Sequence, residues 1–494
     1  CRCWKCSRRW SCRPIAPAWH AGAAPIRGSA FAPSAAGTSH NKFTDYNVNA
    51  NGVILNNGVN NNTSLRDGVI GRNPHFIGSP AQVILNEVTG ASPSRLEGET
   101  EVVGSSAPVI VANPNGVACD GCSFQNTPRV TLTTGVPDSS KGNVSLDISR
   151  GKVSVEGAGL RQGGIGQVDL VGQNVTLDGP VQLGADASLN VIAGTNGYDH
   201  ASGKVTAKTG TVAALGAVDA SELGAMEAGR ISVMSTAQGA GVRLDGNMAS
   251  TAGDITIDAA GNIQIGADRK AGAAYAPQSV TSKGNLVIHT SGEVNKNSNS
   301  YSYRNTTIEA GSMKNTGRIE ADNDLSVKVS GDYENSGKLD AARDMVLDLQ
   351  GTTHNSGVVD VGRNLLVHTG GEFVNDNIKI TAGNKITVDG TGNVVNRDTD
   401  MYAAGGIDIN VPNLQHRGVS YLGSDGTVSV IAGNTIENLD HDSVIQASGA
   451  LSLVAGGLID NRFGQILGGS DILLRAPTIV NYNGLIAATG ESGD

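Results

Sequence analysis

A short repeat in the second half of the chain constrains its fold more than any other sequence feature. The segments Asn315-Thr-Gly-Arg-Ile, Asn335-Ser-Gly-Lys-Leu and Asn355-Ser-Gly-Val-Val recur at one constant spacing. A short strand pattern follows each of them at the same distance, beginning at Leu325, Met345 and Leu365. Because a unit of about 20 residues cannot bury an apolar face alone, such units are expected to stack into a solenoid.

Within each repeat, the residue types predict particular places in a stacked coil. An interior apolar ladder would be formed by Ile319, Leu339 and Val359. A second ladder, of side-chain amides bonded along the axis, would be formed by Asn315, Asn335 and Asn355. Corners with positive φ would be supplied by Gly317, Gly337 and Gly357. The prediction is an all-β, parallel β-helix whose coils stack at about 4.8 Å.

The remainder of the chain has the same β character. Short alternating segments such as Val144–Ile148 and Ile255–Ile257 are separated by Gly, Asn or Asp. Gly accounts for 67 of 494 residues and aromatic residues for only 4%, which suits a narrow β structure with many turns better than a compact α/β enzyme. A formal net charge of −10 argues against a nucleic-acid partner. No apolar run is long enough for stable membrane insertion.

Two Asn-Pro sequences mark tight turns between residues 38 and 135. Asn113-Pro114-Asn115-Gly116 follows the apolar strand Val109–Val111. Its Pro fixes φ at the second turn position, its second Asn tolerates the third, and its Gly closes the turn. Asn73-Pro74 is a second such sequence upstream. The less regular segment 41–135 is predicted to be an N-terminal β cap, because an uncapped solenoid end aggregates.

These residues resemble the secretion domain of two-partner secretion exoproteins: filamentous haemagglutinins, haemolysins and contact-dependent growth-inhibition proteins. Residues 113–116 match the family's second Asn-Pro motif in full, whereas Asn73-Pro74-His75-Phe76 matches the first only in its Asn-Pro. His40–Phe43, Val53–Asn57 and Val83–Val88 are also similar to the family. Cys119-Asp-Gly-Cys122 looks most like the growth-inhibition branch.

The resemblance implies a right-handed β-helix and a route of export. The secretion domain would be recognised in the periplasm by the POTRA domains of a dedicated outer-membrane β-barrel transporter. The chain would then fold outside, as a secreted or cell-surface adhesin or as a stem that delivers a toxin. Its further partner would be the surface of a host cell or a neighbouring bacterium.

The resemblance also suggests residues for partner recognition. These are Asn73, Pro74, Asn113, Pro114, Asn115 and Gly116, whose turns would position the recognised surface. An equally weighted alternative is that these Asn residues only stabilise turns of the β-helix. Val109–Val111 would pair with the edge of a POTRA sheet by strand addition.

Composition and resemblance together divide the chain into four parts. Residues 38–290 are assigned to the secretion domain, 291–308 to a protruding polar loop, and 309–494 to a truncated set of haemagglutinin-type repeats. Residues 1–37 are atypical, because all three Trp and four of the six Cys (Cys1, Cys3, Cys6 and Cys12) lie between Cys1 and Trp19. The spacing of these Cys is unlike a usual zinc finger, so translated upstream sequence or a wrongly assigned start is favoured. A signal peptide is a third reading.

No catalytic, metal or cofactor site is expected from the motifs. Cys119 and Cys122 lack the βαβ context of a redox pair, which favours a short disulfide or a buried thiol pair. The nine His residues show no metal-ligand spacing. The alternative function is a β-helix polysaccharide lyase or hydrolase, since Glu320, Asp340 and Asp360 recur at the repeat period. Neighbouring basic residues, Arg318 and Lys338, instead favour a solvated charged stripe.

Overall fold

The computed structural model describes residues 26–29 (backbone only), 33, 34, 36–76, 78–140, 142–208, 217–236, 239, 241–267, 279–488 and 490. The atypical residues 1–25, with all three Trp and the first four Cys, lie outside the described residues. The regular elements of the described part are all strands, β1 to β56. Within the described ranges, no helix is long and apolar enough to cross a membrane.

The chain divides into two compact units, which are described separately. The first comprises Cys1–Gln173 and Thr195–Lys208, and the second comprises Asn174–Gly194 and Thr209–Asp494. Both units consist mainly of parallel strands joined in register from coil to coil. The prediction of an all-β parallel β-helix is therefore confirmed.

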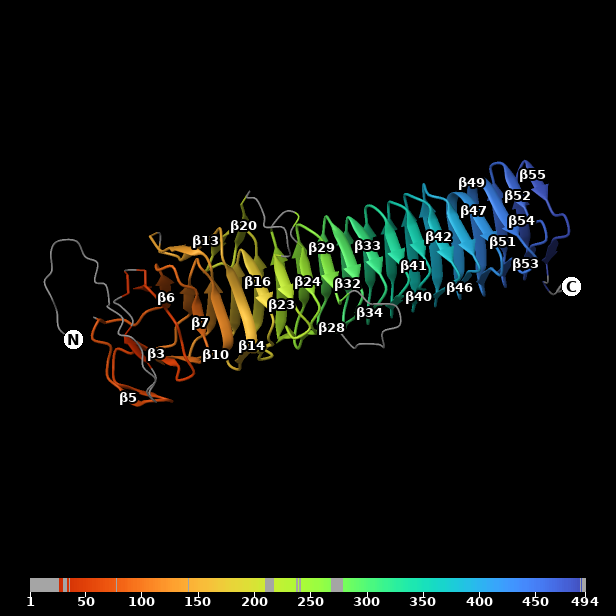
Figure 1. The fold of residues 1–494 in the computed structure, drawn as a ribbon. Helices are drawn as coiled ribbons and strands as arrows, with labels where there is room; N and C mark the ends of the chain where they lie inside the picture. Colours follow the sequence, from red (N-terminus) through yellow and green to blue (C-terminus); the bar gives the residue numbers. More distant parts are fainter. Residues whose placement is uncertain are drawn as a thin grey trace. The chain divides into compact units, whose positions relative to one another are not determined.

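The second unit contains the regular repeats. Here β32 (Thr306–Ala310) pairs in parallel with β35 (Leu325–Val329), which pairs with β38 (Met345–Leu349) and then with β41 (Asn364–Thr369). Each of these four strands joins the strand three elements before or after it, so a coil in this part of the unit holds three strands (Figure 1). Leu325 stands opposite Met345, so the register offset between β35 and β38 equals the period read from the sequence.

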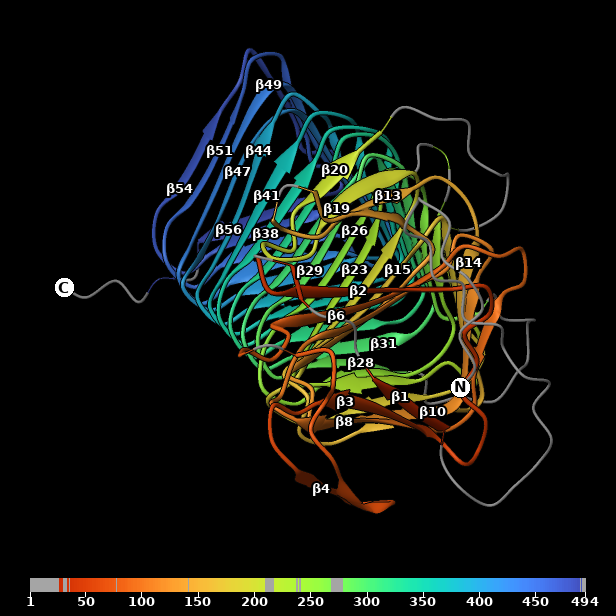
Figure 2. The ribbon, with the colours of Figure 1, turned by 90° about the vertical axis from the view of Figure 1, so that its left-hand side faces the viewer.

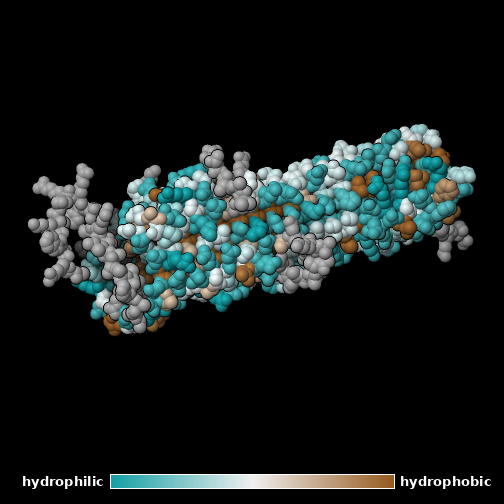
Figure 3. All heavy atoms as spheres, in the orientation of Figure 1, coloured by the Kyte–Doolittle hydropathy of each residue, from teal (hydrophilic) through white to brown (hydrophobic). Residues whose placement is uncertain are grey.

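Alternate side chains in these strands face the interior, because a strand has a period of two. Ile319, Leu339 and Val359 lie in register and are each at most 1% exposed. Full burial of such a side chain contributes roughly 1.5–3 kcal/mol relative to exposure. Figure 3 shows that hydrophilic residues make up most of the visible surface. Exposed apolar side chains include those of β54 (Ile472–Arg475), β55 (Thr478–Val480) and β56 (Leu485–Ala488), such as Leu473 and Leu485.

The predicted role of the repeat glycines is wrong. Gly317, Gly337 and Gly357 are not among the residues with positive φ. A Cβ added to Gly337 would lie 1.9 Å from the carbonyl oxygen of Gly317, and one added to Gly357 would lie 1.9 Å from that of Gly337. Glycine is required there because successive coil backbones approach too closely for any side chain.

The predicted polar loop at 291–308 is also wrong. This segment forms β30 (Glu293–Lys296), β31 (Asn299–Ser302) and the start of β32, and it pairs in parallel with the strands of the next coil. Inward positions are taken by small polar residues such as Ser302, whose Oγ lies 2.8 Å from Oγ1 of Thr306. The strands tolerate this polarity because a short hydroxyl fits the interior and finds a hydrogen-bond partner there.

The first unit begins with the segment predicted to be a cap. β2 (Thr38–Phe43), β6 (Val83–Val88), β9 (Val109–Ala112) and β11 (Arg129–Thr133) form one parallel series. A second series contains β3 (Val53–Asn57), β8 (Glu99–Gly104) and β10 (Val117–Gln125). The hairpin of β4 (Asn62–Ser64) and β5 (Gly68–Ile70) projects beyond these strands (Figure 2), and Ser64 Oγ ties it to β8 by donating to Glu101 at 2.6 Å. The first unit also contains a separate antiparallel sheet of four strands. These are β12 (Val136–Asp138), β13 (Ser145–Ile148), β19 (Asn196–Asp199) and β20 (Val205–Ala207).

Candidate functional site

The Asn113-Pro114-Asn115-Gly116 turn is held by a buried side chain. The carbonyl of Asn113 accepts a hydrogen bond from the backbone N–H of Gly116 at 3.0 Å, which closes the turn. The Asn113 side chain is fully buried, and its Nδ2 donates to the Ser92 carbonyl (2.9 Å) and to Ser94 Oγ (3.0 Å). Its Oδ1 accepts bonds from the backbone N–H and the Nδ2 of Asn115. One side chain therefore ties the turn to the neighbouring coil.

The Asn73-Pro74-His75-Phe76 turn repeats this arrangement. Oδ1 of Asn73 accepts from the backbone N–H of His75 at 2.9 Å, and the Asn73 carbonyl accepts from that of Phe76 at 3.3 Å. Nδ2 of Asn73 donates to the Asn56 carbonyl at 2.8 Å.

The two turns differ at their fourth residue. Gly116 has φ +129°, in the region that favours glycine, whereas Phe76 has no positive φ and is buried. The departure from the family pattern at residues 75 and 76 therefore leaves the turn itself intact.

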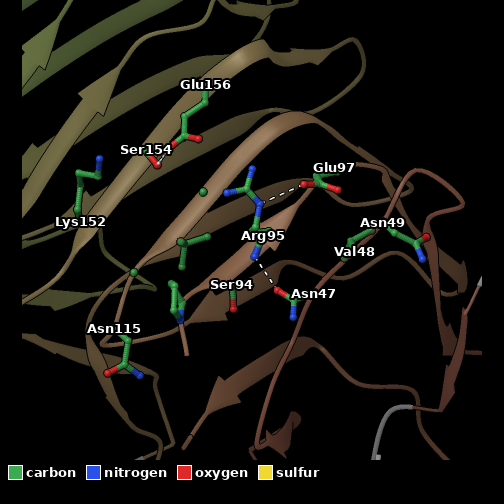
Figure 4. A pocket seen from close by; sticks show the side chains of 14 residues that line it. Asn47, Val48, Asn49, Ser94, Arg95, Glu97, Asn115, Lys152, Ser154 and Glu156 are labelled. Carbon is green, nitrogen blue, oxygen red and sulfur yellow. Dashed lines mark hydrogen bonds and ion pairs between the residues drawn. The ribbon is translucent and has the colours of Figure 1, made fainter. Parts of the chain in front are cut away.

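A shallow hollow of about 530 Å³ lies against the Asn113–Gly116 turn. Figure 4 shows Asn115, Arg95, Glu97, Lys152 and Glu156 around it. The hollow forms because Ala118 stands in register between Arg95 on β7 (Ser94–Leu96) and Ser154 on β14 (Lys152–Gln162), and Ala has the shortest of these side chains. Arg95 Nε donates to Glu97 Oε1 at 3.1 Å, and this hydrogen bond raises the pKa of Arg95. The turn therefore adjoins an exposed surface that carries both signs of charge.

The strand before this turn does not offer a free edge. Each residue of β9 is buried, and the strand pairs with β6 on one side and β11 on the other. Strand addition at Val109–Val111, as the resemblance suggested, would therefore require an unfolded chain.

Cys119 and Cys122 are bonded to each other as a disulfide within β10. Between Asp120 and Cys122 the register with β14 shifts, and Gly121 has φ +80°. Oδ1 of Asp120 accepts from the backbone N–H of Ala158 at 2.9 Å across this irregularity. The disulfide lies at a bulge in a strand and not at the start of a helix, where redox-active pairs are found.

A buried polar cluster in the first unit was not predicted from the sequence. Arg129 donates through Nε to Asp169 Oδ2 and through Nη2 to the Tyr198 hydroxyl, both at 2.7 Å. Thr131 Oγ1 lies 3.2 Å from Nδ1 of His200 and donates to Asp169. Burial, aided by the charge of Arg129, lowers the pKa of His200 to about 4. This cluster attaches residues 198–200 to β11, and no local sequence pattern brings these residues together.

The predicted amide ladder is present as hydrogen bonds in the second unit. Asn315 Nδ2 donates to Asn335 Oδ1, and Asn335 Nδ2 donates to Asn355 Oδ1, both at 2.8 Å. The ladder continues through Asn375 to Asn396. His416 stands next in register, followed by Asn438. A His in this position was not predicted from the repeat.

The acidic stripe of the repeats is neutralised by neighbouring cations. Arg318 Nη2 lies 3.0 Å from Glu320 and 2.9 Å from Asp340, and Lys338 Nζ lies 2.8 Å from Asp340 and 3.4 Å from Asp360. Among the described residues, no three His, Cys, Asp or Glu side chains are grouped so that they could hold a metal ion. The stripe therefore has the properties of a solvated row of ion pairs.

Residues 23–265 match the model of the TPS secretion domain. The chain is 46% identical over 239 residues to the 16S rRNA endonuclease CdiA of Enterobacter cloacae subsp. cloacae, covering 47% of this chain. It is 39% identical over 241 residues, again 47% of this chain, to filamentous hemagglutinin of Bordetella pertussis. Each match spans only 7% of the relative's length.

Among solved structures, the crystal structure of the filamentous hemagglutinin secretion domain matches with a TM-score of 0.47 and 29% identity, over 72% of this chain and 95% of that chain. The Asn113–Gly116 turn, its matching turn at Asn73 and the cysteine bulge all lie inside the matched range 23–265. Residues 23–265, about half of this chain, therefore match the TPS secretion domain.

Proposed function

We propose that this chain is the N-terminal part of a secreted exoprotein that is exported from the periplasm by a dedicated outer-membrane transporter with POTRA domains. The second unit would then extend from the cell as part of an adhesin or of a stem that carries a toxin to neighbouring cells. The observation that carries the proposal is the match of residues 23–265 to the TPS secretion domain. The nuclease names of the CdiA relatives belong to proteins of which this chain spans 7–8%.

The two Asn-Pro turns would serve export indirectly. Asn113 and Asn73 are buried, at 0% and 1% exposure, and their hydrogen bonds go to neighbouring coils. A transporter cannot contact such side chains in the folded domain. We therefore propose that the secretion domain is already folded when the transporter recognises it, before the following coils cross the pore in extended form. Recognition is then assigned to the charged hollow beside the second turn, which Arg95 and Lys152 line. The Asn side chains would hold that surface in shape.

A coil-by-coil fold also suits passage through a pore. Each coil needs only the preceding one as a template, so folding can proceed from one end with contacts to the nearest coil. Cys119 and Cys122 are the last cysteines of the sequence, and they are close neighbours along it. A disulfide between residues three positions apart closes only a small loop, so it adds little to the width of an extended chain.

Secretion with and without the transporter tests the proposal. The chain would carry a working signal peptide, and the intact protein in the medium would be measured when its cognate transporter is present or absent. We expect secretion only with the transporter. Replacing both Arg95 and Lys152 by Ala should lower secretion by about tenfold, the effect of losing about 1.4 kcal/mol of recognition, while the melting temperature of the purified chain stays unchanged.

The matched control is Arg343→Ala, which removes an exposed arginine that is ion-paired with Asp324 in the second unit. This variant should be secreted like the wild type. Equal secretion without the transporter would refute the export route. Normal secretion of the Arg95/Lys152 double variant would leave the route intact but show that recognition does not use the hollow.

A further inference from the structure

A second hollow, of about 450 Å³, lies on the outer face of three neighbouring strands of the second unit. These are β46 (Asp400–Ala403), β48 (Tyr421–Ser424) and β50 (Val444–Ala447), and they pair in parallel in that order (β46 is labelled in Figure 1). Its volume lies within the range of small-molecule sites, about 300–1,000 Å³. Nothing in the export proposal uses this surface.

An aromatic ring forms the floor of this hollow. A Cβ added to Gly423 would lie 2.1 Å from Cζ and 2.2 Å from Cε1 of Tyr421. The Tyr421 ring therefore lies along its own strand, over the backbone of Gly423, and covers that glycine, which is buried. Tyr421 itself is partly exposed. The strand supports one side of the ring, and the other side is left for a ligand.

Polar groups surround this ring at several points. Asp400 stands in register beside Tyr421 on β46, and Lys379 stands in register beside Asp400 on β43 (Lys379–Ala382). Asp442, which is exposed, lines the hollow from the turn before β50. Tyr402 also lines the hollow, and its hydroxyl donates a hydrogen bond to Asp425. This bond restricts the side-chain rotation of Tyr402. Carboxylates accept hydrogen bonds, and the ammonium group donates them.

An aromatic face beside separate carboxylates is the chemistry that recognises a sugar ring. The C–H groups on one face of a pyranose pack on the aromatic ring, while its hydroxyls donate to carboxylates and accept from an ammonium group. The lining holds two carboxylates, Asp400 and Asp442, against one ammonium group, Lys379. This excess of negative charge disfavours sulfated or carboxylated glycans.

We propose that the hollow over Tyr421 is a binding site for a hexopyranose unit of a neutral glycan. Tyr421 supplies the stacking surface, Asp400 and Asp442 accept hydrogen bonds from the sugar hydroxyls, and Lys379 donates one. The inference goes beyond the proposed export function and does not depend on it, because binding is measured on the purified, folded chain.

Saturation-transfer NMR and calorimetric titration of the full chain test this site. The probes are three neutral hexasaccharides (maltohexaose, cellohexaose and a β-galactan hexasaccharide), with a heparin hexasaccharide as the polyanionic probe. We expect at least one neutral probe to bind and heparin not to bind. Tyr421→Ala should weaken binding by about tenfold or more, and Tyr421→Phe should retain it because the ring remains.

Gly423→Ala tests the position of the Tyr421 ring without removing it. It keeps both tyrosines, but its Cβ must displace the Tyr421 ring, so binding should fall about as far as in Tyr421→Ala. Tyr301→Ala is the matched control: Tyr301 is also outward-facing, its hydroxyl donates to Asp322 at 2.7 Å, and it lies outside the hollow. Circular dichroism verifies that each variant is folded.

Three outcomes would overturn the proposal. The first is the absence of binding by all three neutral probes at millimolar concentration. The second is binding that survives both Tyr421→Ala and Gly423→Ala. The third is binding of heparin alone.

Discussion

Asn113 in the first unit and Asn335 in the second are both fully buried, but they satisfy their amides in opposite ways. Asn113 bonds to a backbone carbonyl, a serine hydroxyl and the residue two positions later, all at places fixed by one turn. Asn335 bonds to the same side-chain type above and below it in the stack, through Asn315 and Asn355. One asparagine thus serves a unique turn, and the other serves a repeated ladder.

The difference shows how periodicity changes the importance of a residue. A ladder position has neighbours of its own kind, and Asn315 keeps a second bond, to the Gly317 carbonyl, when its partner is lost. The turn at 113–116 has no such alternative bonds, because the Asn113 side chain makes four of the hydrogen bonds that hold it. We therefore expect the irregular first unit to be less tolerant of substitution at its buried Asn than the regular second unit.

The largest expected effect is that of Asn113→Ala. The change removes every side-chain hydrogen bond that Asn113 makes, including those to the buried Ser94 hydroxyl and the backbone N–H of Asn115. We expect it to destabilise this region by about 3 kcal/mol. Hydrogen exchange of the amides in residues 90–120, followed by mass spectrometry, measures this loss. Asn115→Ala is the control, since Asn115 is only half-buried and its Nδ2 bonds chiefly to the Gly90 carbonyl. An equal loss in both variants would contradict the central role of Asn113.

The next effect is a loss of stability in acid, because the described residues of each unit include one buried histidine, His200 in the first and His416 in the second. Burial lowers the pKa of His416 and of His200 to about 4. An unfolded His has a pKa of about 6.5, so between pH 6.5 and 4 the unfolded chain binds a proton that the folded chain does not. Stability should be complete above pH 6.5 and should fall as the pH drops, by about 2 kcal/mol per His at pH 5.

His416→Asn separates the two contributions. His416 replaces an Asn in the ladder, where its Nε2 lies 3.2 Å from the Val444 carbonyl. The variant should lose its acid sensitivity in residues 390–460 and keep that of the first unit, as measured by hydrogen exchange at pH 5 and pH 7 with correction for intrinsic rates. Unchanged acid sensitivity of residues 390–460 would show that another group titrates there.

The smallest expected effect is that of Asn335→Ala. This variant removes one rung, leaves Asn355 Oδ1 without its donor and should destabilise the adjoining coils by about 1–2 kcal/mol. Urea unfolding of the second unit, monitored by hydrogen exchange, provides the measurement. Lys338→Ala in the same coil is the control, because its partly exposed ion pairs should contribute less than about 1 kcal/mol. A cost for Asn335→Ala above that of Asn113→Ala would reverse the comparison between the units.

The candidate sites were predictable only where their chemistry is local in sequence. The turn at 113–116 follows from the residues of that turn, and the amide ladder follows from the repeat. The cluster of Arg129, Asp169 and His200 joins residues up to 71 positions apart, so no window of sequence reveals it. The position of Tyr421 over Gly423 likewise depends on a side-chain conformation that only the folded strand defines.

The sequence by itself determined the period, the strand alternation and the stacked ladders, because each of these follows from residue types that recur at a constant spacing. The tertiary structure decided how each repeated residue is used. Gly337 is needed for the closeness of two backbones, where its sequence suggested a positive φ. The polar segment 291–308 winds into the solenoid because strand pairing with the next coil decides its path more than its polarity does. The distances between neighbouring coils are set only when the coils stack, so they cannot be read from the spacing of residues along the sequence.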